Sequence, residues 1–206
     1  MILAAGESSR MGRDKALLPL GEQTFLEHLA GLLDGEVEPL LVVLGHHADQ
    51  IERQARLPAA AKVLHNPEYS LGQLSSLHVA LRSLDQRQID AVLVCLVDHP
   101  GITKQVLRAL RTSFEQSRAM IMIPTWHGRR GHPVLFSSRL FQELLDAPLD
   151  QGARAVVRSH AQEVETVDVD EEGILWDVDR PEDYAALQSR WMSSNPAGSK
   201  RAGERA

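Results

Sequence analysis

The sequence predicts an α/β fold: a single-domain, three-layer α/β/α sandwich in which helices cover both faces of a mostly parallel sheet with a small antiparallel addition. The continuous apolar runs at residues 39–44 and 91–97 are typical of strands buried on both faces. Segments of helical period stand between such runs, as the crossover connections of a parallel sheet require. With 206 residues, 43% of them hydrophobic, the chain is large enough to build one core.

The first half of the chain predicts three strands and a helix. Residues 1–4 form a strand before a glycine turn, but the run is short for a central strand, so we expect a few natural strand residues upstream of Met1. Thr24 and Glu27 have the spacing of a capping box, and an apolar helical face follows as far as Gly35. Residues 39–44 and 61–65 are the next two strands.

The second half continues the alternation of helices and strands. We predict helices at residues 75–84, 103–114, 138–145 and 152–160, strands at 91–97, 119–124 and 164–169, a basic turn that enters a strand over 126–136, and a last helix that starts at Pro181. Ser75 or Ser76 is the predicted N-cap of the helix at 75–84. The domain is expected to cover residues 1–192, and the tail at 193–206, rich in Ser, Gly, Ala and Arg, is predicted to be disordered.

Composition excludes several classes of partner and site. The net charge of −6 gives no general positive field for DNA or RNA, so no nucleic acid is expected. No apolar run approaches 18 residues and no export signal is visible, which predicts a cytoplasmic protein without a membrane partner. Cys95 lies inside an apolar run and is predicted to be buried and inert. His46 and His47 should point in opposite directions on an extended chain, which argues against a zinc site.

The turn after the first strand has the composition of a phosphate-binding loop. Gly6 and Gly12 allow positive φ and close approach to a ligand, while Arg10, Arg13 and Lys15 supply positive charge. A P-loop is excluded because five residues separate the glycines and Lys15 is followed by alanine. A dinucleotide-binding loop is excluded because no Gly-x-Gly is present. A glycine-rich turn with a solvated basic face remains the structural alternative.

Three later segments add candidate ligand groups, each with a structural alternative. Asp98 follows the strand at 91–97, where ligands of open α/β sheets bind and where a divalent metal could be held, although such an Asp is also common in loops. The loop at Gly72 leads into a helix that a serine could simply cap. Asp179 precedes the last helix and, with Glu182, has the spacing of a capping box.

The loop sequence from Leu3 to Lys15, Leu-Ala-Ala-Gly-Glu-Ser-Ser-Arg-Met-Gly-Arg-Asp-Lys, resembles the signature loop of the nucleotidyltransferases that join a nucleoside triphosphate to a phosphorylated acceptor. It is most similar to the molybdenum cofactor cytidylyltransferase branch. Four later segments resemble the same branch in the same order, so the likeness covers roughly residues 2–187. The resemblance implies a GT-A, Rossmann-like fold and an in-line transfer that releases pyrophosphate.

The resemblance also implies roles for individual residues. It implies catalytic roles for Arg10, Lys15 and Asp98. It also implies that Asp98 and Asp179 would hold Mg²⁺, with Asp177 as the alternative second ligand. Arg129, Arg130 and His132, from a Gly-Arg-Arg-Gly-His-Pro-Val-Leu-Phe segment, would face the acceptor. The remaining residues implied to bind substrate are Leu3, Ala4, Ala5, Gly6, Ser8, Ser9, Gly12, Gly72, Ser75 and Ser76.

The identity of the substrates is an expectation from the same resemblance. Ala5 favours CTP, because the version of the loop with alanine there usually accompanies cytosine, whereas Asp14 is closer to the guanylyl branch. The molybdenum cofactor is the expected acceptor, with a sugar phosphate or an isoprenoid phosphate as alternatives, and a molybdoenzyme maturation partner could receive the product. A nucleotide-binding accessory protein without catalysis is the alternative class, but the presence of Lys15, Asp98 and Asp179 together argues against it.

Overall fold

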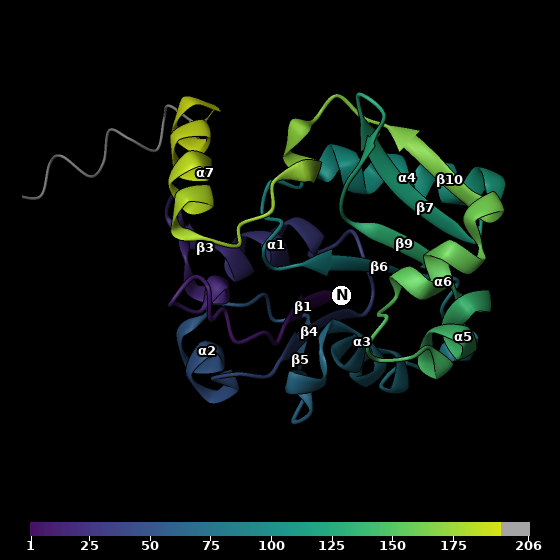
Figure 1. The fold of residues 1–206 in the computed structure, drawn as a ribbon, viewed down its shortest axis with the longest axis horizontal. Coiled ribbons are helices and arrows are strands. Elements are labelled where there is room, and N and C mark those ends of the chain that lie inside the picture. The colour runs from purple at the N-terminus through teal and green to yellow at the C-terminus, as the bar shows by residue number, and fades with distance from the viewer. Residues whose placement is uncertain (195–206) are drawn as a thin grey trace, which may run out of the picture.

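An eight-stranded mixed sheet lies between two layers of helices in the computed structural model, which describes residues 1–194 (Figure 1). The strand order is β10-β7-β9-β6-β1-β4-β5, with β8 paired to β7. The segment from β6 through β1 and β4 to β5 is parallel, β10 is parallel to β7, and β9 is antiparallel to both β6 and β7. The predicted fold class is therefore confirmed.

The strands follow the apolar runs of the sequence closely. They span β1 Ile2–Ala4, β2 Pro19–Leu20, β3 Gln23–Thr24, β4 Leu40–Leu44, β5 Ala61–His65, β6 Ala91–Leu96, β7 Ile121–Trp126, β8 Arg129–Arg130, β9 Val134–Ser137 and β10 Val164–Asp168. The strands β2 and β3 form a separate antiparallel pair. Every residue of β4 is buried, because alternate side chains enter the cores on the two faces of the sheet.

The helices divide between the two faces. They span α1 Phe25–Leu33, α2 Ala48–Gln54, α3 Gln73–Arg82, α4 Lys104–Ser117, α5 Phe141–Asp146, α6 Arg154–Ser159 and α7 Pro181–Ser194. The helices α1, α2, α4 and α7 place side chains in one core, and α3, α5 and α6 place side chains in the other. Because β1, β4 and β6 are parallel, their carboxyl ends lie at the same edge of the sheet, next to the loops that follow them.

The capping box is confirmed. Thr24 accepts a hydrogen bond from the backbone N–H of Glu27, and the Glu27 carboxylate accepts one from the backbone N–H of Thr24. The predicted serine cap of α3 is wrong: the helix begins at Gln73 with Gly72 as N-cap, at a φ of 99° that favours glycine. At α7 the backbone N–H groups of Asp179 and Arg180 donate to Asp183, so the capping acid is not Glu182.

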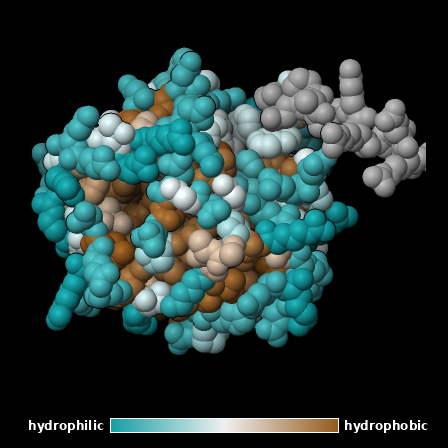
Figure 2. All heavy atoms as spheres, turned by 180° about the vertical axis from the view of Figure 1, so that it is seen from behind, coloured by the Kyte–Doolittle hydropathy of each residue, from teal (hydrophilic) through white to brown (hydrophobic). Residues whose placement is uncertain are grey.

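Several predictions about the exterior and the termini have mixed outcomes. Helix α7 includes residues 193 and 194, which we had placed in the tail, and residues 195–206 lie outside the described part of the chain. No helix within residues 1–194 has the length and apolarity to cross a bilayer. Seen from behind, the molecule shows apolar side chains gathered in a hollow near the middle of the face (Figure 2).

Cys95 is buried, and burial raises the pKa of its thiol to about 11, which makes the thiol inert as predicted.

One ion pair at the end of α6 should make stability depend on pH. The hydrogen bond from His160 to Glu143, at 2.6 Å, and the one to Glu163 raise the pKa of His160. The stabilisation is therefore complete below the pKa of the unfolded chain, about 6.5, and is lost as the pH rises through the higher folded value. We expect the Tm of the wild type to fall between pH 6 and pH 9, and His160→Gln to reduce that fall. Thermal melting at each pH measures the fall in Tm, and equal falls in the wild type and the variant would contradict this assignment.

Candidate active site

The loop after β1 is folded around Ser8. The residue adopts positive φ (53°), its carbonyl accepts from the N–H groups of Met11 and Gly12, and its hydroxyl accepts from the N–H of Lys15 at 3.1 Å. Gly12 also has positive φ, at 68°, as the sequence predicted for a tight turn. These contacts bring Lys15 back under the loop, at the start of a short 3₁₀ helix, Lys15–Leu17.

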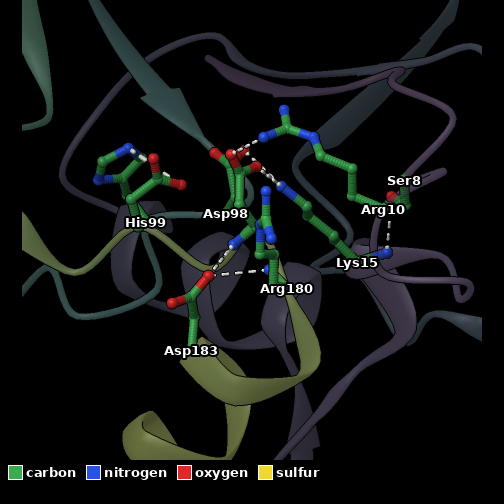
Figure 3. A network of polar contacts seen from close by, with 9 residues as sticks. Ser8, Arg10, Lys15, Asp98, His99, Arg180 and Asp183 are labelled. Carbon is green, nitrogen blue, oxygen red and sulfur yellow. Dashed lines mark hydrogen bonds and ion pairs between the residues drawn. The ribbon is translucent and has the colours of Figure 1, made fainter.

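Lys15 lies between two carboxylates that come from distant parts of the chain (Figure 3). Its Nζ is 3.0 Å from Oδ2 of Asp98, at the end of β6, and 2.6 Å from Oδ1 of Asp179, which precedes α7. Arg10 reaches Oδ2 of the same Asp179 at 2.6 Å, while most of its side chain (64%) stays exposed. The structure thus brings together Arg10, Lys15 and both acids that the sequence indicated.

The charges of this group control its protonation. Burial alone would lower the pKa of Lys15, but Asp98 and Asp179 outweigh it, and the net shift is upward. The hydrogen bond from Lys15 to Asp179 is the main cause that lowers the pKa of Asp179. Lys15 is therefore a permanent cation, fixed in position, and Asp179 a permanent anion near neutral pH.

A cavity of about 300 Å³ opens directly above this group. Its lining includes most of the residues that the sequence indicated for substrate or metal binding: Leu3, Ala4, Ala5, Gly6, Ser8, Ser9, Arg10, Lys15, Gly72, Ser76, Asp98 and Asp179. Gly12 and Ser75 do not line it; each contributes instead to the conformation of its own loop. The lining also includes Tyr69 and Gln73, which flank Gly72 in the sequence; sequence reasoning missed them because it selected only the glycine and the two serines of that segment.

A buried side-chain amide holds the loop around Gly72 against this cavity. The Asn66 side chain is buried; its Nδ2 donates to the hydroxyls of Ser75 at 2.8 Å and Ser76 at 3.0 Å, and its Oδ1 accepts from the N–H of Glu68 at 2.9 Å. The Ser75 hydroxyl also lies 2.7 Å from the carbonyl of Gly72. Ser75 thus shapes the glycine turn, and Ser76 faces the cavity.

Asn66→Ala should destabilise the fold by about 2 to 3 kcal/mol, because it leaves buried polar groups with fewer partners. Urea denaturation measures the change. The control is Gln142→Ala, which removes an exposed amide bound to Asp146 and should cost less than about 0.5 kcal/mol. Equal stability of the two variants would show that the amide network does not hold this loop.

The residues around Asp98 fit a divalent cation. One ligand atom each from Asp98, His99 and Asp177 lies within 4.8 Å of the others. Burial, and after it the charge of Asp98, raise the pKa of Asp177, as expected where two carboxylates lie close together. Asp179, the predicted second ligand, instead pairs with Lys15 and Arg10. The possible ligand atoms that lie close together therefore favour Asp177, our alternative second ligand.

His46 and His47 correct another expectation. His47 adopts left-handed backbone geometry (φ 52°, ψ 28°) at the start of α2, so the two rings do not diverge and their centroids lie 3.8 Å apart. Nδ1 of His47 is 3.1 Å from Asp14, and the three side chains offer ligand atoms within 4.8 Å of one another. The assumption of an extended chain failed because β4 ends at Leu44, before the histidines.

The predicted acceptor wall is only partly supported. Arg129 and Arg130 form the exposed strand β8 and line neither of the cavities beside the sheet edge. His132 lines a second cavity of about 680 Å³, which also has Gly72 and Gln73 in its lining and so adjoins the first. Gly131 is packed so tightly that a Cβ atom would lie 2.4 Å from the carbonyl oxygen of Ile174. The glycine thus serves packing rather than ligand binding.

Known proteins are similar to this chain in sequence and in fold. Residues 1–164 match the family model of the MobA-like NTP transferase domain. A probable molybdenum cofactor guanylyltransferase of Mycobacterium ulcerans (strain Agy99) is 32% identical over 156 residues, which cover 75% of this chain and 74% of that protein. A molybdenum cofactor cytidylyltransferase of Escherichia coli (strain K12) is 22% identical over 191 residues, covering 93% and 95% of the two chains.

Solved structures agree with these matches. A homologue of Mycobacterium tuberculosis Rv0371c from Mycobacterium sp. strain JC1 has a TM-score of 0.81 and 28% identity, covering 94% of this chain and 96% of that one. Rv0371c of Mycobacterium tuberculosis H37Rv in complex with manganese has a TM-score of 0.73 and 27% identity, covering 91% and 95%. With 94% of this chain covered, the likeness to the first of these structures extends beyond residues 1–164, which the family model matches.

Proposed function

Because the chain belongs to the MobA-like NTP transferase family, we propose that it transfers the cytidylyl group of CTP to the phosphate of the molybdenum cofactor, with release of pyrophosphate. The observation that carries this proposal is the position of Lys15 between Asp98 and Asp179, below a cavity lined by the glycine loop. A cation fixed next to a phosphate-sized site is what a phosphoryl-type transfer requires of a protein.

In the proposed reaction, residues of this chain bind and orient the two substrates. An oxygen of the acceptor phosphate attacks the α-phosphorus of the nucleotide; a new P–O bond forms, the bond to the bridging oxygen breaks, and pyrophosphate leaves. The loop amides and Arg10 hold the β- and γ-phosphates, and Lys15 neutralises charge at the α-phosphate. Asp98 and Asp177 would hold a divalent ion, which supplies further neutralisation when bound.

Asp179 has a separate role in this scheme. In the chain without nucleotide it neutralises Arg10 and Lys15, whose bonds to it are both 2.6 Å long. Phosphate oxygens would replace the carboxylate as partners of Arg10, because that side chain is largely exposed and free to turn. The carboxylate thus keeps the two cations in place before the substrate arrives.

The second cavity supports the assignment of the acceptor. Its floor is apolar, formed by Leu96 and Phe136 from the neighbouring strands β6 and β9. Arg154 and Arg158 of α6 stand at its rim, four residues apart and therefore on one face of the helix. A flat ring system that carries a phosphate matches an apolar floor with cations at the rim. The shared residues Gly72 and Gln73 would bring the acceptor phosphate close to the nucleotide.

Two observations bear on the choice of base. The methyl group of Ala5 stands in the wall of the first cavity, which leaves less room than glycine would and favours the smaller cytosine. Transfer of a guanylyl group from GTP is the second candidate, because the M. ulcerans relative is named a guanylyltransferase. Ala5→Gly should therefore raise activity with GTP relative to CTP, by a factor of about ten if the methyl is the main determinant.

The test is turnover of purified protein with molybdenum cofactor and either CTP or GTP, in Mg²⁺ or in Mn²⁺, since a relative was solved with manganese. Release of pyrophosphate and the mass of the dinucleotide product identify the reaction. A cytidine product supports the proposal, and a guanosine product establishes the second candidate. Binding of a nucleotide without a product in any combination would point to the accessory protein instead.

A further inference from the structure

His99 is a polar group of the site that the proposed reaction leaves without a role. It follows Asp98 at the carboxyl end of β6. Its Nε2 is 4.0 Å from Oδ1 of Asp177, too far for a hydrogen bond but suitable for two ligands of one ion. The His99 side chain is 12% exposed, whereas that of Asp177 is 53% exposed, so an ion could enter from the side of Asp177.

The backbone fixes His99 next to Asp177. The N–H of Val178 donates to the carbonyl of Asp98 at 3.0 Å, which ties the segment that carries Asp177 to the end of β6. Gly101 and Gly173 pack so closely that a Cβ atom on Gly101 would lie 2.6 Å from the Gly173 carbonyl oxygen. The two segments are therefore held together by main-chain contacts, independent of any interaction between the side chains.

The charges around His99 suit a cation. Among the described residues, no lysine or arginine is paired with Asp177, whereas Asp179 is paired with both Lys15 and Arg10. The ring of His99 packs against that of His132, with centroids 4.4 Å apart, which limits its rotation.

We propose that His99 is a ligand of the divalent ion through Nε2, together with the carboxylates of Asp98 and Asp177. Mg²⁺ takes oxygen ligands almost exclusively, whereas Mn²⁺ and other first-row transition metals also accept imidazole. The nitrogen ligand therefore makes this site select Mn²⁺ over Mg²⁺. The inference rests on the proposed function only for the view that the site holds a divalent ion.

Mn²⁺ bound to the purified protein without nucleotide provides the test. Electron spin-echo spectroscopy should detect a ¹⁴N coupling from one imidazole on the bound ion. His99→Gln should remove this coupling and weaken Mn²⁺ binding about tenfold or more, while the affinity for Mg²⁺ changes less than about threefold. The matched control is His47→Gln, in the other cluster of the described chain that could hold a metal, and it should keep both the coupling and the affinity.

Three results would overturn the inference: no ¹⁴N coupling in the wild type, a coupling lost in His47→Gln but kept in His99→Gln, or unchanged Mn²⁺ affinity in His99→Gln. If His99→Gln does not fold, Asp177→Asn replaces it, because its side chain is half exposed. That variant should also weaken Mn²⁺ binding, and unchanged binding would overturn the site. The readout involves neither nucleotide nor turnover, so its failure and the failure of the proposed reaction are distinguishable.

Discussion

Replacement of Lys15 by alanine is expected to lower the turnover number about a hundredfold, which corresponds to roughly 3 kcal/mol of transition-state stabilisation. The reason is positional. The Lys15 ammonium is buried, held by Asp98 and Asp179, and it lines the cavity next to the glycine loop, so its charge acts without reorganisation. A water molecule or buffer cation in the space left by the side chain would have no comparable fixed position.

The matched control for Lys15→Ala is Arg13→Ala. Arg13 belongs to the same loop and carries the same charge, but it is exposed and absent from the lining of the cavity. Steady-state turnover at saturating nucleotide separates the two, and Arg13→Ala should stay within about twofold of the wild type. Equal losses in both variants would mean that the net charge of the loop, rather than the position of Lys15, supports the reaction.

The sequence predicted the fold well where local chemistry determines it. The run at β4 is apolar at every position, so only a doubly covered strand accommodates it, and Thr24 with Glu27 determined the start of α1. The order of the strands was less accessible. β9 enters between β6 and β7 through antiparallel pairs, and its pairing with β6 depends on contacts between segments about 40 residues apart, which periodicity does not encode.

For the site, the sequence predicted which groups meet but not how they pair. Lys15, Asp98 and Asp179 were all indicated, yet the choice between Asp177 and Asp179 as metal ligand depends on which carboxylate Lys15 contacts, a matter of tertiary structure. The same holds for His47, whose left-handed backbone turns its ring toward Asp14. The helix cap at Gly72 was missed because Ser75 has the preferred cap chemistry three residues later.

Asp98→Asn is expected to have the largest effect on turnover, a loss of about a thousandfold. The amide keeps the shape of the side chain but removes the negative charge that Lys15 contacts at 3.0 Å and that would bind the divalent ion. Lys15 keeps Asp179 at 2.6 Å and so remains in place. The matched control is Asp90→Asn, directly before β6, whose side chain is 83% exposed, and it should leave turnover within about twofold of the wild type.

Mn²⁺ should stabilise the wild type more than it stabilises Asp98→Asn. Without metal the substitution has two opposed effects: it removes the charge that Lys15 contacts at 3.0 Å, and it relieves the repulsion between Asp98 and Asp177 that contributes to the raised pKa of Asp177. With Mn²⁺, the wild type gains binding energy from an ion held by both carboxylates, so the rise in Tm on addition of Mn²⁺ should be smaller in the variant. Thermal melting with and without Mn²⁺ measures the two rises, and equal rises would show that Asp98 does not bind the ion.

Turnover provides the second readout of Asp98→Asn. A variant that keeps more than a tenth of its turnover would show that the reaction does not depend on this carboxylate.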